Sequence, residues 1–430
     1  MAFDTKRLKS IVGGSAGNLV EWYDWYAYTS FSLYFAASFF PKGDPTAQLL
    51  STAAIFAVGF LMRPIGAWVM GVYGDRHGRK AGLALSVALM AGGSIMIAVG
   101  PTYAQAGVLA PLWLLTARLL QGLSVGGEYG TSATYLSEMA TDGHRGFWSS
   151  FQYVTLIGGQ LLSLAVLLVL QAVLSESDLE TWAWRIPFAI GAVLAILVYV
   201  LRRGLAETDA FKAQSKDRPA STFGNLWRDH PRTFLIVAVV SAGGSLSFYA
   251  FTTYLQKFLV NTSGLSKASA TETMTLALVV FMFLQPVWGA ISDRIGRKPL
   301  LLLFSIGMGI IAVPVFSALA TVSNAQDAFG LILIPLTLLA AYTSIGAVYK
   351  AELFPPHIRT LGVALPYAIG NALFGGTAEY VALRFKGSGY ESGFYWYVTA
   401  VLAASALAFL MLPETKNRDL ASGEERQKMT

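Results

Sequence analysis

Long apolar stretches, separated by short polar segments, run through the whole chain. Each stretch is long enough for a membrane-crossing helix, which needs about 20 apolar residues. The stretches are continuous rather than alternating, so they exclude the short alternating strands of a membrane barrel. The predicted spans are residues 11–39, 49–73, 81–101, 108–138, 147–173, 184–201, 233–259, 268–291, 299–321, 326–350, 359–383 and 393–412.

The composition agrees with a membrane protein and excludes several other classes. Charged residues make up 13% of the chain, about half of the roughly 25% in an ordinary soluble domain. The absence of cysteine excludes disulfides, iron–sulfur clusters, thiolate zinc sites and cysteine nucleophiles. No nucleophile elbow, zinc-binding HExxH helix or phosphate-binding glycine loop is found, so the sequence does not favour an enzyme.

The distribution of basic residues predicts that both termini lie in the cytoplasm. With that orientation, 23 Lys and Arg residues fall in the cytoplasmic tails and loops. Only 5 fall on the opposite face, namely Lys42, Lys257, Lys267, Arg384 and Lys386. Such an excess is the positive-inside signal. The net charge of +6 therefore reflects membrane topology, and we expect a lipid bilayer and no nucleic acid as partner.

Two motifs occur twice, which indicates an internal duplication. Residues 71–80, GVYGDRHGRK, match residues 289–298, GAISDRIGRK, at a displacement of 218. A glutamate followed seven residues later by an arginine recurs at a displacement of 214. Such repeats are typical of secondary transporters. The sequence thus predicts an N-terminal six-helix bundle (1–201), a linker loop (202–232), a C-terminal six-helix bundle (233–412) and a cytoplasmic tail (413–430).

The paired loops are similar to those of the major facilitator superfamily. Further stretches resemble its metabolite–proton symporter branch, namely Gly17–Asp24, Phe60–Gly66, Arg118–Gly122, Gly126–Tyr129 and Trp184–Phe188. The resemblance implies an all-α fold of 12 transmembrane helices in two pseudo-symmetric bundles. It also implies a multi-pass protein of the cell inner membrane that functions as a monomer and needs no cofactor or metal.

The function implied by the resemblance is proton-coupled import of a small carboxylate by alternating access. The first candidate substrate is 2-oxoglutarate. Citrate, another dicarboxylate and shikimate are alternatives, and a sensor that transports nothing is a further one.

The candidate proton site is formed by carboxylates, because all four histidines lie in cytoplasmic loops. Glu21 and Asp24 are three residues apart, so they share a helix face, and two like charges this close favour protonation of one. Arg118 is a plausible counter-charge, since related sugar transporters pair a span-1 acid with a span-4 arginine. The alternative is a permanent salt bridge between the two spans. Glu128 is a further candidate, with a structural role as its alternative.

Two cations are candidates for binding a carboxylate. Arg63 offers a planar fork that matches a carboxylate; alternatively, it satisfies backbone carbonyls freed by Pro64. Lys350 could bind a second carboxylate or extend to the cytoplasmic surface. Polar aromatic and amide side chains on neighbouring predicted spans complete the candidate substrate site, namely Tyr28, Gln152, Gln160, Tyr249, Tyr254 and Asn371.

The repeated motifs predict a cytoplasmic gate. The family geometry implied by the resemblance puts Asp293 near the start of the span that begins at Gly146, and Asp75 near the span that begins at Arg359. A carboxylate is stabilised at a helix N-terminus, so these contacts would act as a latch. Topogenic positive charge alone is the alternative. The candidate gate residues are Gly71, Asp75, Arg76, Arg79, Glu138, Arg145, Asp293, Arg294, Arg297, Glu352 and Arg359.

Overall fold

The structure is a computed structural model. It describes residues 5–41, 43–77, 79–126, 143–203, 223–355 and 358–416, together with Ala133, Ser137 and Arg418. Within that part, the side chains of residues 5–17, 70–84 and 201–203 are not described. All regular elements in the described residues are helices, which confirms the predicted all-α fold class.

The chain forms two compact units. Unit 1 contains Met1–Gly126 and Thr155–Gln214, and unit 2 contains Gly127–Val154 and Ser215–Thr430. One helix, α7 (Arg145–Val173), therefore begins in unit 2 and continues into unit 1. The division that the sequence predicts, with a linker at residues 202–232, stays a prediction.

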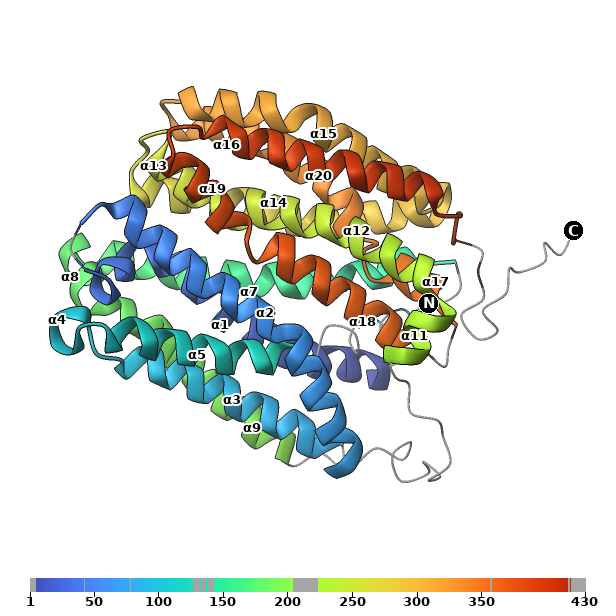
Figure 1. Ribbon diagram of the computed structural model, residues 1–430, viewed down its shortest axis with the longest axis horizontal. Coiled ribbons are helices and arrows are strands. Elements are labelled where there is room, and N and C mark those ends of the chain that lie inside the picture. Colours follow the sequence, from blue (N-terminus) through green and yellow to red (C-terminus); the bar gives the residue numbers. More distant parts are fainter. Residues whose placement is uncertain are drawn as a thin grey trace, which may run out of the picture. The chain divides into compact units, whose positions relative to one another are not determined.

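Unit 1 is built around α2, α3, α5 and α9. Helix α3 packs against both α5 and α9, and α2 packs along α5 (Figure 1). Helix α1 contacts α2, α5 and α9. The elements are α1 (Thr5–Phe39), α2 (Pro45–His77), α3 (Arg79–Val99), α4 (Tyr103–Ala106), α5 (Leu109–Val125), α8 (Glu176–Thr181), the 3-10 helix η1 (Ala183–Arg185) and α9 (Ile186–Arg203).

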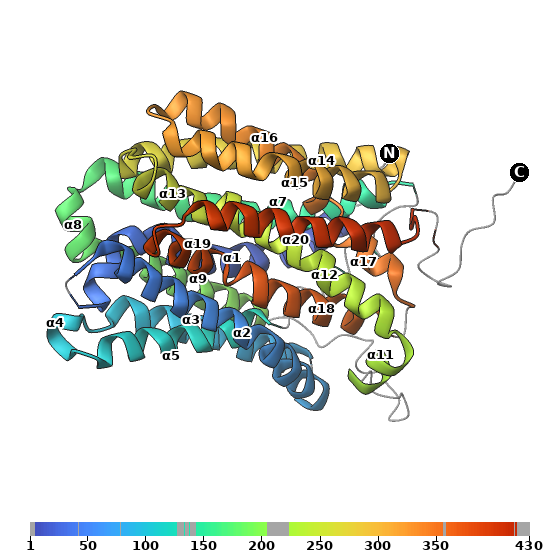
Figure 2. The same cartoon turned by 45° about the horizontal axis from the view of Figure 1, so that its top comes forward.

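Unit 2 is built around α12, which packs against α18 and α20 (Figure 2). Helix α14 packs on α16, and α15 packs on α16 and α20. The elements are α11 (Phe223–Asp229), α12 (Pro231–Tyr249), η2 (Ala250–Tyr254), α13 (Leu255–Asn261), α14 (Lys267–Ile295), α15 (Lys298–Thr321), α16 (Ala325–Thr343), α17 (Val348–Leu353), α18 (Arg359–Gly370), η3 (Asn371–Gly375), α19 (Ala378–Gly387) and α20 (Ser392–Met411).

The predicted spans coincide with described helices or begin as one. Among the described residues, eight helices are long and apolar enough to cross a membrane, and Leu85–Val99 and Leu109–Val125 are shorter apolar helices. Large apolar side chains are highly exposed, as at Trp68 (72%), Val99 (69%) and Ile310 (70%). This exposure suits a surface that faces lipid, because a soluble monomer avoids large apolar patches.

The structure adds interruptions that the apolar runs do not reveal. The predicted span 233–259 contains η2 and the predicted span 359–383 contains η3, and both are π-helices. The predicted span 326–350 is divided into α16 and α17 by the turns at residues 344–347. In contrast, α2 continues through Pro64 to His77, so this proline does not end the helix.

Glycines allow the backbones of α2 and α5 to touch. A Cβ atom at Gly122 would collide with the carbonyl oxygen of Gly59, and one at Gly126 would collide with the carbonyl oxygen of Arg63. Small residues allow this close packing in membranes, where helices are held together mainly by van der Waals contact. The contact fixes the backbone of Arg63 against α5.

We expect Gly122→Ala to destabilise the protein, because its new methyl group meets a backbone atom that cannot move aside. Overpacking of this kind costs about 1–3 kcal/mol. The matched control is Gly92→Ala, where a Cβ atom meets nothing within 4 Å. Thermal unfolding in detergent measures the effect. Equal midpoints for the two variants would contradict the close contact.

Candidate functional site

Arg63 lies in a box of aromatic rings inside unit 1. Its guanidinium carbon is 3.9 Å from the ring centre of Phe60, 4.3 Å from that of Trp25 and 5.2 Å from that of Trp22. The side chain is buried, yet its Nε and NH2 atoms have no hydrogen-bond acceptor among the described residues. No bond to a backbone carbonyl near Pro64 is formed there, so the alternative role suggested by the sequence finds no support.

Arg118 shares the ring of Trp25 with Arg63. Its guanidinium carbon is 3.9 Å from the centre of that ring and 4.4 Å from the centre of Tyr28. Its NH1 group donates a hydrogen bond of 2.6 Å to the side-chain oxygen of Gln121, three residues further along α5. The sequence did not single out Trp25 or Gln121.

Asp24 is fully buried where α1 meets α3, α5 and α9. Its Oδ2 atom accepts hydrogen bonds of 2.6 Å from Ser94 on α3 and of 2.6 Å from Gln121 on α5. Gly191 on α9 lies directly against Oδ1, because a Cβ atom there would collide with it. Within the described part of the chain, Oδ1 has no hydrogen-bond partner.

The predicted pairing of Arg118 with Asp24 thus runs through Gln121. The amide accepts from Arg118 through its oxygen and donates to Asp24 through its nitrogen. Glu21, on the same helix as Asp24, has a different neighbour on α5: Ser124 Oγ lies 3.4 Å from its Oε1 atom. This contact is longer than the bonds at Asp24 and therefore weaker. Glu128 lies outside the described residues.

Lys350 is buried in unit 2 among three tyrosines. Its Nζ atom is 4.3 Å from the ring centre of Tyr367, 5.5 Å from that of Tyr349 and 5.9 Å from that of Tyr342. The side chain is fully buried, so it does not extend to the cytoplasmic surface. Cation–π contacts compensate part of the cost of burying the ammonium group.

Two predicted substrate residues of unit 2 lie together. A Cβ atom at Gly375 would come within 2.6 Å of Asn371 Oδ1 and within 2.9 Å of the Tyr249 ring. The Asn371 amide has no hydrogen-bond partner among the described residues. Tyr254, by contrast, packs against Phe258 and Phe394.

The other predicted substrate residues belong to α1 and α7. The Tyr28 hydroxyl donates a hydrogen bond of 2.9 Å to the carbonyl oxygen of Thr52. This bond fixes the Tyr28 ring against the guanidinium group of Arg118. Gln152 and Gln160 are buried on α7, in unit 2 and unit 1 respectively. The substrate role of all these residues stays a prediction.

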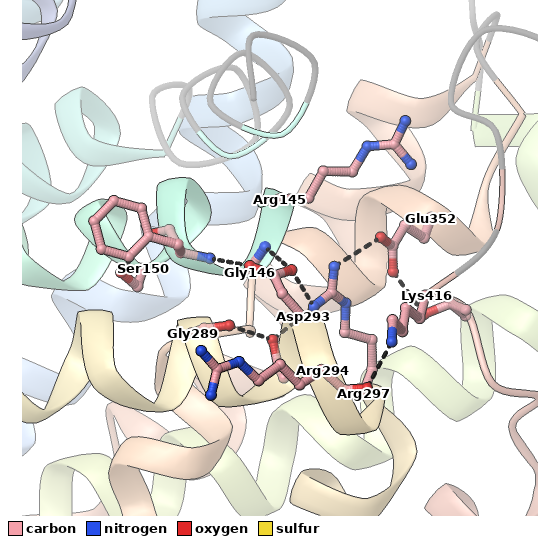
Figure 3. A network of polar contacts seen from close by, with 12 residues as sticks. Arg145, Gly146, Ser150, Gly289, Asp293, Arg294, Arg297, Glu352 and Lys416 are labelled. Carbon is pink, nitrogen blue, oxygen red and sulfur yellow. Dashed lines mark hydrogen bonds and ion pairs between the residues drawn. The ribbon is translucent and has the colours of Figure 1, made fainter. Parts of the chain in front are cut away.

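Asp293 caps the first turn of α7, the position that the family resemblance implies. One carboxylate oxygen accepts a hydrogen bond of 2.7 Å from the backbone N–H of Gly146, and the other accepts one of 2.9 Å from the backbone N–H of Phe147 (Figure 3). Gly289 permits this approach, because a Cβ atom there would lie 2.5 Å from the Gly146 carbonyl oxygen. The contact satisfies backbone donors at the helix N-terminus and places a negative charge beside them.

Arg297 joins this cap to the second motif. Its NH1 group is 2.9 Å from Asp293 and its NH2 group is 3.4 Å from Glu352 (Figure 3). Burial lowers the pKa of Arg297, but the two carboxylates outweigh it and raise the pKa above its ordinary value. The Arg297 side chain therefore stays charged and links both motifs in unit 2.

The remaining gate residues of unit 2 have different partners. Arg359 donates from Nε to the carbonyl oxygens of Ala351 and Phe354 at the end of α17. Arg145 donates 2.7 Å to the carbonyl oxygen of Arg418 in the tail. Arg294 is exposed. Of the other gate candidates, Glu138 and the side chains of Gly71, Asp75, Arg76 and Arg79 lie outside the described residues.

The tail takes part in the same network, which the sequence did not indicate. Glu414 accepts a hydrogen bond of 2.8 Å from the backbone N–H of Arg297 and one of 3.0 Å from the backbone N–H of Lys298, at the start of α15. Thr415 donates 2.7 Å to Glu352. Residues directly after the last span therefore complete the cluster at the ends of α14 and α17.

Lys257, one of the bases that the sequence assigns to the outer face, is buried on α13 and forms an ion pair of 2.6 Å with Glu379. An apolar run that ends near a lysine suggests an exposed side chain, and only the partner on another helix explains its burial. Among the described residues, no group of three or more metal-binding side chains is present.

Comparisons with known proteins agree with this architecture. Residues 17–377 match the family described as Major Facilitator Superfamily. The chain is 54% identical over 407 residues to the alpha-ketoglutarate permease of Escherichia coli (strain K12), covering 95% of this chain and 94% of that protein. It is 34% identical to a citrate-proton symporter of Salmonella typhi, covering 94% of each.

The fold is also that of a solved transporter. The crystal structure of a D-xylose-proton symporter superimposes with a TM-score of 0.78 at 21% identity, covering 97% of this chain and 99% of the other. The twelve-span all-helical fold expected from the paired motifs is thereby confirmed. The chain is a multi-pass membrane transporter rather than an enzyme, and it belongs to the Major Facilitator Superfamily.

Proposed function

We propose that the protein is a proton-coupled symporter of the inner membrane that imports 2-oxoglutarate as a monomer. The relatives support this proposal, since one is named as an alpha-ketoglutarate permease and another as a citrate-proton symporter. The observation that carries it is Arg63, a buried guanidinium in an aromatic box whose Nε and NH2 atoms lack acceptors among the described residues.

Arg63 is suited to bind one carboxylate of the substrate. A guanidinium presents parallel N–H donors that match the two oxygens of a carboxylate. Burying such a group without an acceptor is costly, and a bound carboxylate would remove that cost. The rings of Phe60, Trp25 and Trp22 hold the guanidinium in place, so little side-chain entropy is lost on binding.

Lys350 is the candidate for the second carboxylate. Its ammonium group lies among tyrosine rings in unit 2, which stabilise a cation without neutralising its charge. Lys350 is therefore a second buried cation with aromatic neighbours, besides Arg63. The unpartnered amide of Asn371, beside Tyr249, is available for a keto or carboxylate oxygen.

Asp24 is the candidate proton carrier. In its charged form it accepts from Ser94 and Gln121, which orients the Gln121 amide so that its oxygen accepts from Arg118. A proton on Oδ1, the oxygen beside Gly191, would weaken Asp24 as an acceptor. Gln121 would then be free to turn, and Arg118 would lose its fixed acceptor. Protonation of Asp24 would thus change the hydrogen bonding of Arg118, which contacts the same Trp25 ring as Arg63.

The cap of α7 by Asp293 is the candidate cytoplasmic latch. It would hold the cytoplasmic side closed until the loaded carrier breaks the two hydrogen bonds to Gly146 and Phe147. Each such contact of a carboxylate with a helix N-terminus contributes about 0.3–1 kcal/mol at an exposed site and more when partly buried. A contact of this size can be made and broken in every cycle.

Charge balance limits the coupling. A dianion that enters with n protons moves n−2 charges, and each net negative charge that enters costs about 2.3 kcal/mol per 100 mV. Uptake against the membrane potential therefore needs two protons, or it must draw on the pH gradient or the substrate gradient.

Reconstituted protein should accumulate labelled 2-oxoglutarate in liposomes under an inward proton gradient. A protonophore should abolish the accumulation, which separates a symporter from a passive carrier or a sensor. A competition panel of mono-, di- and tricarboxylates identifies the substrate. If citrate or malate accumulates and 2-oxoglutarate does not, the substrate is misassigned while the fold and the coupling stand.

Arg63→Ala should weaken substrate binding by about 10–100-fold, because a hydrogen bond to a charged group contributes about 1.5–3 kcal/mol. Arg63→Lys should recover part of the loss, since it restores the charge but not the fork. Arg228→Ala serves as control, because that side chain is 88% exposed. Binding is measured by calorimetry on protein in nanodiscs. Unchanged affinity in Arg63→Ala would remove this residue from the site.

Asp24→Asn should exchange substrate across the membrane but lose uptake driven by the proton gradient, because asparagine keeps the shape and cannot carry a proton. Glu21→Gln and the double variant decide which acid is required. Counterflow and gradient-driven uptake are measured on the same liposomes. Undiminished uphill uptake by the double variant would rule out both acids as coupling groups.

A further inference from the structure

Lys257 and Glu379 form a buried ion pair that the proposed transport steps do not use. Lys257 Nζ lies 2.6 Å from Glu379 Oε2, and the two side chains are 0% and 5% exposed. Lys257 belongs to α13 and Glu379 to α19. Each charge would be strongly unfavourable alone in an apolar interior, so neither partner can leave the other without a large penalty.

Each helix of this pair begins within three residues of the end of a π-helix. Helix η2 ends at Tyr254 and α13 begins at the next residue, Leu255. Helix η3 ends at Gly375 and α19 begins three residues later. A π-helix adds one residue to a turn and breaks the regular ladder of backbone hydrogen bonds. Such places are where helices bend. Spans 231–261 and 359–387 therefore each consist of two segments with a weak point between them.

A second contact joins the same two segments near their ends. Lys386 donates 2.8 Å to the hydroxyl of Thr262, and that hydroxyl donates 2.6 Å to Glu391. Helix α19 also packs against η2. Figures 1 and 2 both show α13 and α19 side by side, at the end of unit 2 opposite to α17. The two segments are thus connected at two levels.

We propose that the Lys257–Glu379 pair is a positioning pair that makes α13 and α19 move as one rigid segment on the two π-helices. The contacts of the segment with neighbouring helices join neutral groups, as in the hydrogen bonds from Gln256 to Thr271 on α14 (3.1 Å) and from Ser263 to the carbonyl oxygen of Leu319 on α15 (2.7 Å), and these are the contacts that open. Movement of the segment shifts Gly375 and Asn371 in η3 relative to Tyr249, where the candidate substrate groups of unit 2 meet.

Hydrogen exchange on the full chain in nanodiscs, without substrate, tests the proposal. Backbone amides of residues 255–261 and 378–387 should exchange at matching rates in the parent. The variant Lys257→Met/Glu379→Leu removes both charges and leaves no charge unpaired. It should raise the exchange of the two segments by different factors, at least threefold apart. The transposed variant Lys257→Glu/Glu379→Lys should restore the matching rates.

The control is Arg228→Met/Asp229→Leu, which removes an exposed ion pair of unit 2 and should leave both segments unchanged. If the two segments still exchange at matching rates in Lys257→Met/Glu379→Leu, the pair does not join them and the proposal is wrong. The same holds if the parent rates differ.

A second readout rests on the proposed function. In the parent, 2-oxoglutarate should slow the exchange of both segments by the same factor. In Lys257→Met/Glu379→Leu it should slow only one of them. If 2-oxoglutarate protects nothing in the parent, the substrate assignment fails, while the comparison without substrate still decides the role of the pair.

Discussion

A charge inside an apolar membrane helix has to be compensated, and this constraint organises both units. The compensation takes three forms in the described part of the chain. Lys257 has a carboxylate partner, Asp24 has neutral hydrogen-bond donors, and Arg63 and Lys350 have aromatic rings. In the first form an opposite charge compensates the buried group, whereas in the other two neutral donors or aromatic rings do. The roles proposed for Asp24 and Arg63 follow from this difference, because a group that is already paired with an opposite charge has little to gain from a ligand or a proton.

The same reasoning explains why the motifs at the helix ends are rich in charges. Asp293 supplies the acceptor that the first backbone N–H groups of α7 lack, and Arg297 links it to Glu352. Gly146 and Phe147 belong to unit 2, as Asp293 does, so this cap lies within one unit, although α7 belongs to unit 1 over most of its length.

The spans were predictable from the sequence because a membrane helix needs only a long apolar run. The π-helices η2 and η3 were not, since one extra residue in a turn leaves such a run unchanged. The position of Asp293 was implied by the family that the repeated motifs resemble, whereas the link from Arg118 to Asp24 through Gln121 was not predicted. No sequence pattern around a neutral amide such as Gln121 indicates which side chain on another span it will bind. The burial of Lys257 was not predictable for the same reason, because its partner Glu379 lies 122 residues away along the chain.

The docking of the tail has a consequence for how the protein is made. Glu414 binds the backbone at Arg297 and Lys298, and Thr415 binds Glu352. These partners are synthesised more than 60 residues before the tail. Since chains emerge from the N-terminus onwards, α15 and Glu352 lack these partners until residues 414 and 415 have left the ribosome. The cytoplasmic cluster of unit 2 is therefore completed last, when the other spans have already been synthesised, and a nascent chain cannot close it early.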